Sequence, residues 1–419
     1  MKKLIASASL LALGAIAVNA QGQANSQGEK PWSIGATLRG FYDDNINTSP
    51  DGFEQESFGA EVGPYAALNL FLDQTTLGLS YNYQMRWFED RPNAGSADHS
   101  HQVNGKLSHT FSERLSFDLT DSFVIAQEPE VLAAPGSGIA FPLRAEGDNM
   151  RNSAQASLTA QMSEQLGLVF GYDNNWFDYE NPGLSQLLDR FEHYGRINLR
   201  YTIVPETVGV IGYQAGLIDY TEDDAFVGIT PAPGRVLRPS HRDRLSHYFY
   251  VGADHTFNPQ LNASIRGGVE YADYFNALPG MRDDAINPYA DGNITWTYLP
   301  GSTIQLGARH QRMATDVLGV GATVVQDAET TMVYGSWNHA LTGKLRTSVL
   351  ANYQWAQYDR VNFDDHILFA GAQISYDINE FLAAEAGYFF DKLDSDIVAA
   401  GVAREYTRNR VFVGLRANY

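Results

Sequence analysis

Apolar and polar residues alternate strictly along the last ten residues of the chain, from Arg410 to Tyr419. The apolar set of this segment is Val411, Val413, Leu415, Ala417 and the terminal Tyr419. The same alternation recurs about every twenty residues nearly to the start of the chain, and such repetition indicates an architecture better than one segment can. A period of two places alternate side chains on opposite faces of a β-strand. The pattern therefore predicts an all-β fold, a transmembrane antiparallel up-and-down β-barrel that closes through its terminal strand.

Three segments near the N-terminus show the alternation most clearly: residues 32–42, 58–70 and 77–87. Each can cross a bilayer as a tilted strand, which takes about 9 to 11 residues. The same template predicts further strands near 100–111, 115–127, 151–162, 166–179, 190–203, 208–220, 244–257, 261–275, 286–298, 303–313, 329–341, 345–358, 365–378, 381–392 and 404–419. The result is about 18 strands, an even number as expected for a bacterial single-chain barrel. In the segment 208–220, Val208 and Val210 are out of phase with the later apolar positions, which predicts a β-bulge.

Short and long connections alternate between the predicted strands. The short ones are residues 73–75, 112–114, 163–165, 204–206, 258–260, 300–301, 342–344 and 379–380. The long ones between them are acidic or rich in Gly and Pro. Because short turns of outer-membrane barrels face the periplasm and long loops face the exterior, both termini should lie on the periplasmic side.

The six tryptophans lie on the apolar register near strand ends. With the terminal tyrosine they form the predicted aromatic girdle, which consists of Trp32, Trp87, Trp176, Trp296, Trp337, Trp355 and Tyr419. Aromatic side chains gather in this way at both membrane interfaces. A soluble sandwich or propeller would also contain alternating strands, but it would not require this placement. Most histidines share the register, and the pair His99 and His101 lacks the further ligands that a metal site needs, so no metal site is predicted.

The N-terminal residues look like a cleaved secretory signal. Two lysines precede an apolar run, residues 4–18, that is too short to span a membrane, and Val-Asn-Ala at 18–20 is a small-residue cleavage pattern. We expect residues 1–20 to be a signal peptide, 21–31 a short periplasmic segment and 32–419 a barrel in the cell outer membrane. No later run of about 18 apolar residues suggests a transmembrane helix.

Charge and cysteine content exclude several functions. The net charge is −20, and loss of the two signal lysines takes it to −22, so nucleic acid is not an expected partner. The chain has no cysteine. Disulfides and thiolate metal sites are therefore excluded, although export would place the protein in an oxidising compartment.

The polar register carries charges of both signs. The predicted pore-lining residues are Arg39, Arg86, Lys106, Arg196, Arg200, Arg266, Arg309, Arg410, Glu61, Asp118, Asp173 and Glu270. Unpaired ions in a dry core would cost several kcal/mol each, which indicates a wet interior. A barrel of about 18 strands is also too wide for side chains alone to fill.

Closure of the barrel should bring Arg408, Arg410 and Arg416 beside Arg39 and form a basic wall. If carboxylates lie opposite, the resulting transverse field would orient polar solutes. Alternatively, the charges form ion-pair networks that only brace the barrel. The sequence does not decide between these interpretations.

The third long connection, residues 128–149, is uncharged at its centre. It contains the predicted constriction residues Val131, Leu132, Pro135, Ile139 and Phe141. Such a segment is poorly suited to exposure in water, and in general porins the third loop folds into the barrel. Packing against a partner subunit or across the mouth is the competing interpretation. Inward tyrosines could stack sugar rings, a role that would need a continuous track of rings.

The segment Gly40-Phe41-Tyr42-Asp43-Asp44-Asn45-Ile46 resembles the putative β-barrel porin 2 family of bacterial outer-membrane proteins. The resemblance implies an outer-membrane porin, in some cases associated with exopolysaccharide export. It implies no catalytic or binding residues, and fold analogy does not identify a substrate.

Together these observations predict a porin-like channel for passive diffusion of small hydrophilic solutes. The alternatives are a barrel component of exopolysaccharide export or a structural outer-membrane protein. A barrel-rim hydrolase is disfavoured because the histidines are scattered and no Gly-x-Ser-x-Gly elbow is present, so neither catalysis nor a cofactor is predicted. The expected partners are outer-membrane lipid, the barrel-assembly machinery through the C-terminal strand, and small polar solutes or saccharides. A homotrimer is left open.

Overall fold

The computed structural model describes residues 30–419 except 92–94, 128–131, 134–139, 142–147, 227–235, 316, 318, 321–322, 359–362, 400–401 and 404. The predicted signal peptide, residues 1–20, and most of the segment 21–31 lie outside the described residues.

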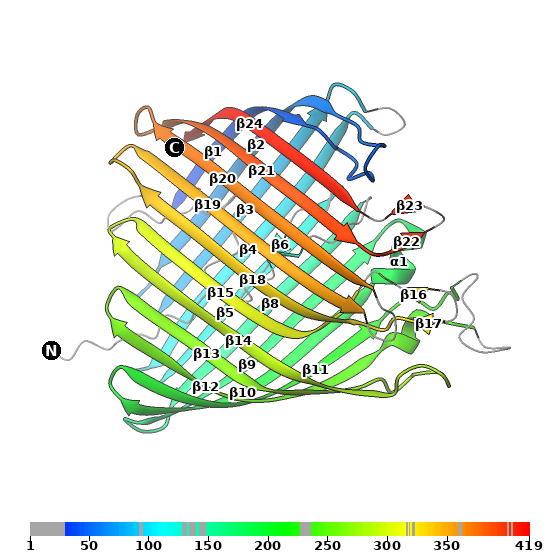
Figure 1. Ribbon diagram of the computed structural model, residues 1–419. Helices are drawn as coiled ribbons and strands as arrows, with labels where there is room; N and C mark the ends of the chain where they lie inside the picture. Colours follow the sequence, from blue (N-terminus) through cyan, green and yellow to red (C-terminus); the bar gives the residue numbers. More distant parts are fainter. Residues whose placement is uncertain are drawn as a thin grey trace.

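Eighteen long strands form one closed antiparallel barrel, as predicted (Figure 1). They are β1 (Trp32–Asp43), β2 (Ser57–Phe71), β3 (Thr75–Phe88), β4 (Ala97–Ser112), β5 (Leu115–Ala126), β8 (Asn149–Gln161), β9 (Leu166–Tyr179), β10 (Arg190–Val204), β11 (Thr207–Tyr220), β12 (Arg244–Asn258), β13 (Leu261–Asp273), β14 (Asp284–Leu299), β15 (Ser302–Met313), β18 (Ala328–Ala340), β19 (Leu345–Tyr358), β20 (Asp364–Asp377), β21 (Leu382–Ser395) and β24 (Tyr406–Asn418). Each strand pairs with its neighbours in sequence. The first and last, β1 and β24, pair from Gly35↔Asn418 to Asp43↔Arg410 and close the barrel.

The alternation in the sequence becomes an inside-out distribution of polarity. On the outer face, Leu38 is 58% and Val413 is 66% exposed. Their neighbours in sequence, Arg39 and Phe412, point inward and are largely buried. Short turns gather at one end of the barrel, and the start of β1 meets the end of β24 there, since the Ile34 N–H donates to the Tyr419 carbonyl oxygen at 3.1 Å. The periplasmic location of this end stays a prediction from the sequence.

The long loops contain several small elements. These are the hairpins β6 (Leu132–Ala133) with β7 (Ala140–Phe141), β16 (Gly319–Val320) with β17 (Thr323–Val324) and β22 (Val398–Ala399) with β23 (Val402–Ala403), and the helices α1 (Pro182–Leu188) and η1 (Pro239–Arg242). Asn181 caps α1 by accepting the Gly183 N–H at 2.9 Å. No helix among the described residues is long and apolar enough to cross a membrane.

Inward tyrosines pack over glycines of adjacent strands. A Cβ atom on Gly212 would come within 2.2 Å of the Tyr250 ring, and one on Gly307 would come within 2.3 Å of the Tyr334 ring. Only glycine leaves room for this close approach. The Tyr250 and Tyr334 rings are therefore wall packing and are only 8% exposed.

The predicted bulge in 208–220 is wrong in position. β11 pairs with β12 without interruption, and the register shift lies in β10 between Thr202 and Val204, beside the turn. Val210 is out of phase because it points inward and packs against Tyr248 and Tyr250. An apolar residue on the polar register explains the sequence signal without an inserted residue.

The tryptophans lie on the outward register, where Trp32, Trp87, Trp296 and Trp337 are exposed and Trp176 and Trp355 are half-buried. The terminal Tyr419 ring is 62% exposed and lies 6.1 Å from the Trp32 ring. Their contact with a membrane interface remains our interpretation of this placement.

Several outward histidines form hydrogen-bonded pairs with tyrosines on adjacent strands. Examples are Tyr81–His101 at 2.9 Å and Tyr172–His193 at 2.8 Å, each joining adjacent strands. The sequence placed these histidines on the correct face but did not reveal the tyrosine partners. An interfacial position suits both rings, which have an apolar body and a polar atom.

Candidate functional site: the barrel lumen and its mouth

A charge network on the inward face joins strands from the two ends of the chain. Arg39 on β1 contacts Glu61 on β2 and Glu385 on β21, each at 2.8 Å. Arg86 on β3 contacts the other Glu61 oxygen at 3.2 Å. Four strands are thus linked through two arginines and two carboxylates.

The far side of the lumen carries a second set of ion pairs. Asp254 on β12 contacts Arg200 on β10 at 2.8 Å and Arg266 on β13 at 2.6 Å. Asp291 on β14 contacts Arg309 on β15 at 2.7 Å. Asp173 and Arg196 form a further pair between β9 and β10.

The two sides therefore do not carry opposite charges. Each side pairs its own arginines with its own carboxylates, which removes the geometric basis of the transverse-field interpretation. The arrangement favours the alternative, in which ion pairs brace the wall. Ions that are adjacent and of opposite sign also cancel most of each other's field at a distance.

Three predicted pore-lining residues make other contacts. Lys106 is exposed on the inward register and has no ion pair with another described residue. Asp118 accepts a hydrogen bond from the Ser108 hydroxyl at 2.7 Å. The Arg410 guanidinium lies 5.4 Å from the centre of the Phe389 ring.

Glu270 does not line open space. It is fully buried in the wall near the loop end, where its carboxylate accepts from the Tyr248 hydroxyl at 2.8 Å and from the Arg312 N–H at 3.0 Å. Its position on the inward register is as predicted, but the end of β15 covers it. The Glu270 carboxylate is therefore part of the wall and does not line the lumen.

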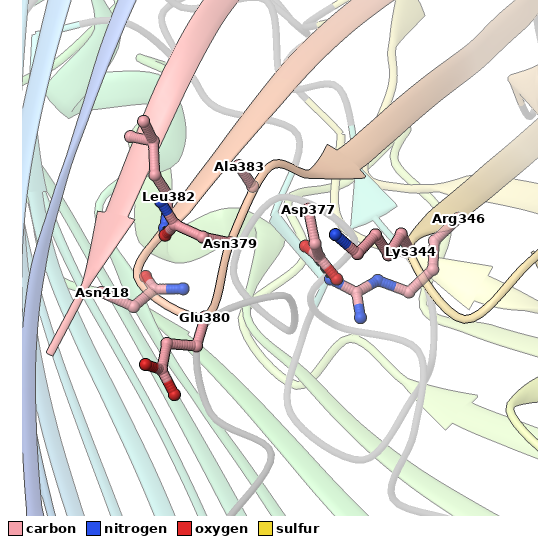
Figure 2. Close-up of a pocket in the computed structure, with 8 residues that line it drawn as sticks. All are labelled: Lys344, Arg346, Asp377, Asn379, Glu380, Leu382, Ala383 and Asn418. Carbon is pink, nitrogen blue, oxygen red and sulfur yellow. Dashed lines mark hydrogen bonds and ion pairs between the residues drawn. The ribbon is translucent and has the colours of Figure 1, made fainter.

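At the short-turn end, polar side chains surround a cavity of about 390 Å³ (Figure 2). Lys344, Arg346 and Asp377 lie on one side, and Asn379, Glu380 and Asn418 on the other. The Arg346–Asp377 pair is 2.8 Å long, and the arginine side chain is 51% exposed. The cavity therefore has a largely polar lining at the short-turn end.

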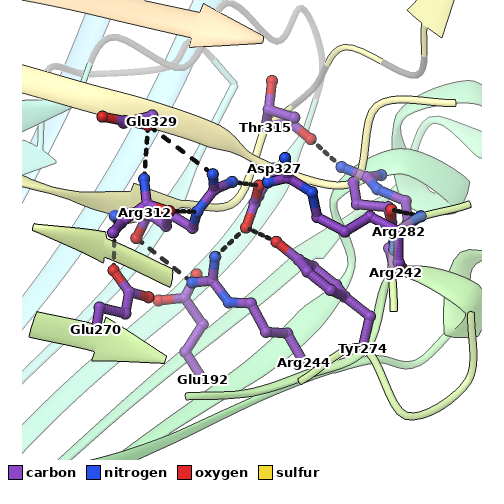
Figure 3. A network of polar contacts seen from close by, with 12 residues as sticks. Glu192, Arg242, Arg244, Glu270, Tyr274, Arg282, Arg312, Thr315, Asp327 and Glu329 are labelled. Atoms are coloured by element: carbon purple, nitrogen blue, oxygen red, sulfur yellow. Dashed lines mark hydrogen bonds and ion pairs between the residues drawn. The ribbon is translucent and has the colours of Figure 1, made fainter. Parts of the chain in front are cut away.

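The loop end contains a buried network that the sequence reasoning missed (Figure 3). Asp327, in the loop before β18, contacts Arg244 on β12 and Arg312 on β15, and it accepts from the Tyr274 hydroxyl. Arg244 and Arg312 lie in strands, whereas Asp327 and Tyr274 lie just outside them. All four side chains are nearly inaccessible to solvent. A buried charge requires partners, but nothing local in the sequence indicated which loop would supply the carboxylate.

Electrostatics at the loop end follow from this burial. Burial opposes ionisation of Asp327, but the guanidiniums of Arg244 and Arg312 outweigh it and hold the pKa of Asp327 below its usual range. Asp189 and Asp243, which precede β10 and β12, have no such pairing. Burial raises the pKa of each to about 6, against hydrogen bonds from backbone N–H groups that lower it.

Apolar side chains lock the long loops to one another. Phe226 and Leu237 from one loop pack with Val324 from another. Val325, from that second loop, packs with Ile397 beyond β21. One side of the mouth is thus a packed layer of loops, which the acidic and Gly/Pro-rich composition of these loops did not predict.

The motif at 40–46 fastens the closing seam. Asp43 is fully buried and accepts from Arg408 on β24, with Nε 2.9 Å and Nη2 2.5 Å from Oδ2. Asp44 accepts from the backbone and side-chain nitrogens of Asn409 at 2.6 and 2.7 Å. Asn45 donates to the Thr407 carbonyl oxygen at 3.0 Å. The two consecutive aspartates therefore join the first strand to the last.

Of the predicted constriction residues, Leu132 and Phe141 lie opposite each other in the β6–β7 pair. Val131, Pro135 and Ile139 lie outside the described residues. Figure 1 places β6 near mid-height of the barrel in that view, well away from the loop-end hairpins β16–β17 and β22–β23.

A closed 18-stranded barrel with an apolar outer face and a charged inner face is an outer-membrane barrel of the porin type. Residues 282–419 match the protein family described as Putative beta-barrel porin 2. The family resemblance predicted from the sequence is thereby confirmed over the C-terminal strands, although the motif at 40–46 lies outside the matched residues.

No curated protein matches the chain. Among solved structures, OccAB4 of Acinetobacter baumannii is 13% identical with a TM-score of 0.43, and covers 94% of this chain and 100% of its own. OpdK of Pseudomonas aeruginosa with vanillate is 10% identical with a TM-score of 0.46 over 93% and 99%. A BenF-like porin from Pseudomonas fluorescens Pf-5 is 11% identical with a TM-score of 0.44 over 93% and 99%.

Proposed function

We propose that the protein is a passive diffusion channel for small hydrophilic solutes, without catalytic activity. The observation that carries this proposal is the inner face of a barrel whose strand number exceeds what side chains can fill. Ionic groups on that face keep contact with solvent, as for Arg200 and Asp254, whose side chains are 25% and 27% exposed. Water in the lumen is the environment that such groups require.

We assign the lining to the inward ions other than Glu270. Local pairing cancels most of their charge, so the channel should discriminate weakly between ions. The exposed Lys106, which has no ion pair with another described residue, adds a positive charge to the inward face. The expected preference is therefore a modest one for anions.

We assign the constriction to the segment 128–149. The position of β6 in Figure 1 supports a loop that folds down into the barrel. Replacement of residues 131–141 by a short Gly/Ser linker should raise single-channel conductance about twofold, because the narrowest part dominates the resistance of a pore. Shortening the loop 44–56, where no constriction is proposed, is the matched control. Equal conductance in the wild type and the 131–141 variant would refute the assignment.

A saccharide track receives little support. The inward tyrosines Tyr248, Tyr250 and Tyr334 are at most 8% exposed and lie against glycines or other rings, so their faces are not free for stacking. Our proposal for export and assembly has three parts. The signal peptide is cleaved after residue 20, the assembly machinery recognises the C-terminal strand, and the barrels can associate as a homotrimer.

The test is single-channel recording of the mature chain, residues 21–419, in a planar bilayer with a salt gradient. Large stable steps with a small anion-side reversal potential are expected. Silence from protein shown to be folded and inserted would overturn the open channel and favour a structural or partner-gated barrel.

A further inference from the structure

The strand ladder is incomplete at one seam of the barrel. Other strand pairs that share a short turn remain paired up to the loop end, for example Arg190↔Tyr220 between β10 and β11. Between β14 and β15 the pairing stops at Ala290↔His310. The first six residues of β14, Asp284 to Tyr289, pair with β13 only. This unpaired stretch of β14, with β15 beyond His310, is called the open seam.

Side chains replace the missing backbone hydrogen bonds on the inner side of the open seam. Arg312 Nε donates to the Asn287 side-chain oxygen at 2.7 Å, and Asn287 Nδ2 donates to Glu329 on β18 at 2.6 Å. Arg312 also contacts Asp327 at 2.6 Å, and its backbone N–H reaches Glu270 at 3.0 Å (Figure 3). These bonds form a side-chain latch between β14 and β15.

The outer side of the open seam is apolar. Ile286 is 74% exposed, and Pro288 and Ala290 share its face. Proline has no N–H for a ladder and is tolerated where one side of a strand is unpaired. Ile286 lies opposite Tyr271, whose ring lies 6.4 Å from that of His247 on the outward face. The open seam therefore lies at the same level of the barrel as the aromatic residues near the loop end.

A backbone ladder and a side-chain latch differ in how they can open. Parting a ladder exposes a row of backbone N–H and C=O groups to lipid, which offers them no hydrogen-bond partners. Rotation of the Arg312 side chain breaks its bonds to Asn287 and Asp327 without breaking the pairing of β14 with β13 or of β15 with β18. An opening here would have an apolar outer rim and a charged inner rim.

We propose that the open seam is a lateral gate, through which a single-chain amphiphile passes between the outer leaflet and the mouth of the lumen. The alkyl chain would lie against Ile286 and Pro288, and the polar head would replace partners of Arg312 on the inner side. This role goes beyond passive diffusion along the barrel axis and depends only on the placement of the barrel in a membrane.

The test exploits the absence of cysteine in the chain. The double variant Asn287→Cys, Arg312→Cys is placed in nanodiscs that contain a diazirine-bearing hexadecanoate. It is then studied unlinked, joined by a short bis-methanethiosulfonate linker, and after reductive cleavage of the linker. Photolabelled residues are mapped by mass spectrometry. The matched control is Ala308→Cys, Val333→Cys, whose positions are paired across the complete β15–β18 ladder.

Labelling of inward Tyr248 and Tyr274 should fall at least fivefold when the seam is linked and should return after cleavage, while the control pair has no effect. The single variant Arg312→Ala, made in the cysteine-free chain, should show more labelling of Tyr248 and Tyr274 than the wild type. Outward residues such as Ile265 should be labelled equally in every sample. Inward labelling that is absent throughout, or that ignores the linker, would overturn the gate. Each sample is checked for heat-modifiable migration and conductance, so loss of the channel and loss of the gate are separate results.

Discussion

The contact between Asp43 and Arg408 should stabilise the closed barrel. It joins residues 365 positions apart in the sequence, and only 1% of the Asp43 side chain and 10% of the Arg408 side chain is exposed. Substitution of Asp43 by Asn keeps the shape of the side chain. It removes one of the acceptor oxygens and places an N–H₂ group near the arginine donors, so the buried guanidinium loses the negative charge of Asp43.

The magnitude follows from this burial. Loss of one partner from a buried ion pair costs about 3 to 5 kcal/mol, because the other charge remains in a poorly solvated place. Asp44 and Asn45 still hold the seam, so we expect the lower end, about 3 kcal/mol. Arg408→Met removes the guanidinium that contacts Asp43. The double variant should therefore be less destabilised than the sum of the singles, by about 2 kcal/mol.

The assay is equilibrium urea unfolding of the barrel in lipid vesicles, followed by tryptophan fluorescence. Arg346→Gln is the matched control, since its ion pair with Asp377 is half exposed and should contribute less than about 1 kcal/mol. If Asp43→Asn changes the unfolding free energy no more than Arg346→Gln does, or if the double variant is simply additive, the closing-seam argument is wrong.

Three further outcomes are expected. Burial raises the pKa of Asp243 to about 6, above its value in the unfolded chain. The stability that protonation gives to the loop around Asp243 is therefore present at low pH and is lost as the pH rises through about 6. Hydrogen exchange of this loop should be slower at pH 5 than at pH 8 after correction for intrinsic rates, and Asp243→Asn should remove the difference. Gly212→Val should destabilise the barrel by about 1 to 3 kcal/mol through its clash with the Tyr250 ring, and Tyr250→Ala should partly restore the urea midpoint; no rescue would argue against this packing. Deletion of Tyr419, whose ring contacts Trp32 and Phe381, should reduce the yield of heat-modifiable barrel in an assembly assay while leaving expression unchanged.

The wall of the barrel was predictable because its determinants are local. A period of two, interrupted by short turns, assigns each side chain to a face before any pairing is known. Arg39 and Leu38 were thus placed on opposite faces correctly, and so were the tryptophans. Even the misplaced bulge came from a true local signal, since Val210 does break the alternation.

The pairing of charges could not be predicted, because it depends on the stagger of the strands and on which loop folds where. Arg312 belongs by alternation to the outward register of His310, yet the end of β15 bends inward and buries it against Asp327. Similarly, the basic wall expected from Arg39 and Arg408 is compensated by Glu385 and Asp43. The sequence by itself determined the strands, their faces and the class of barrel, since these depend on neighbouring residues. Only the tertiary structure decided the ion pairs, the packed mouth and the open seam, since these depend on contacts between residues that are far apart in the chain.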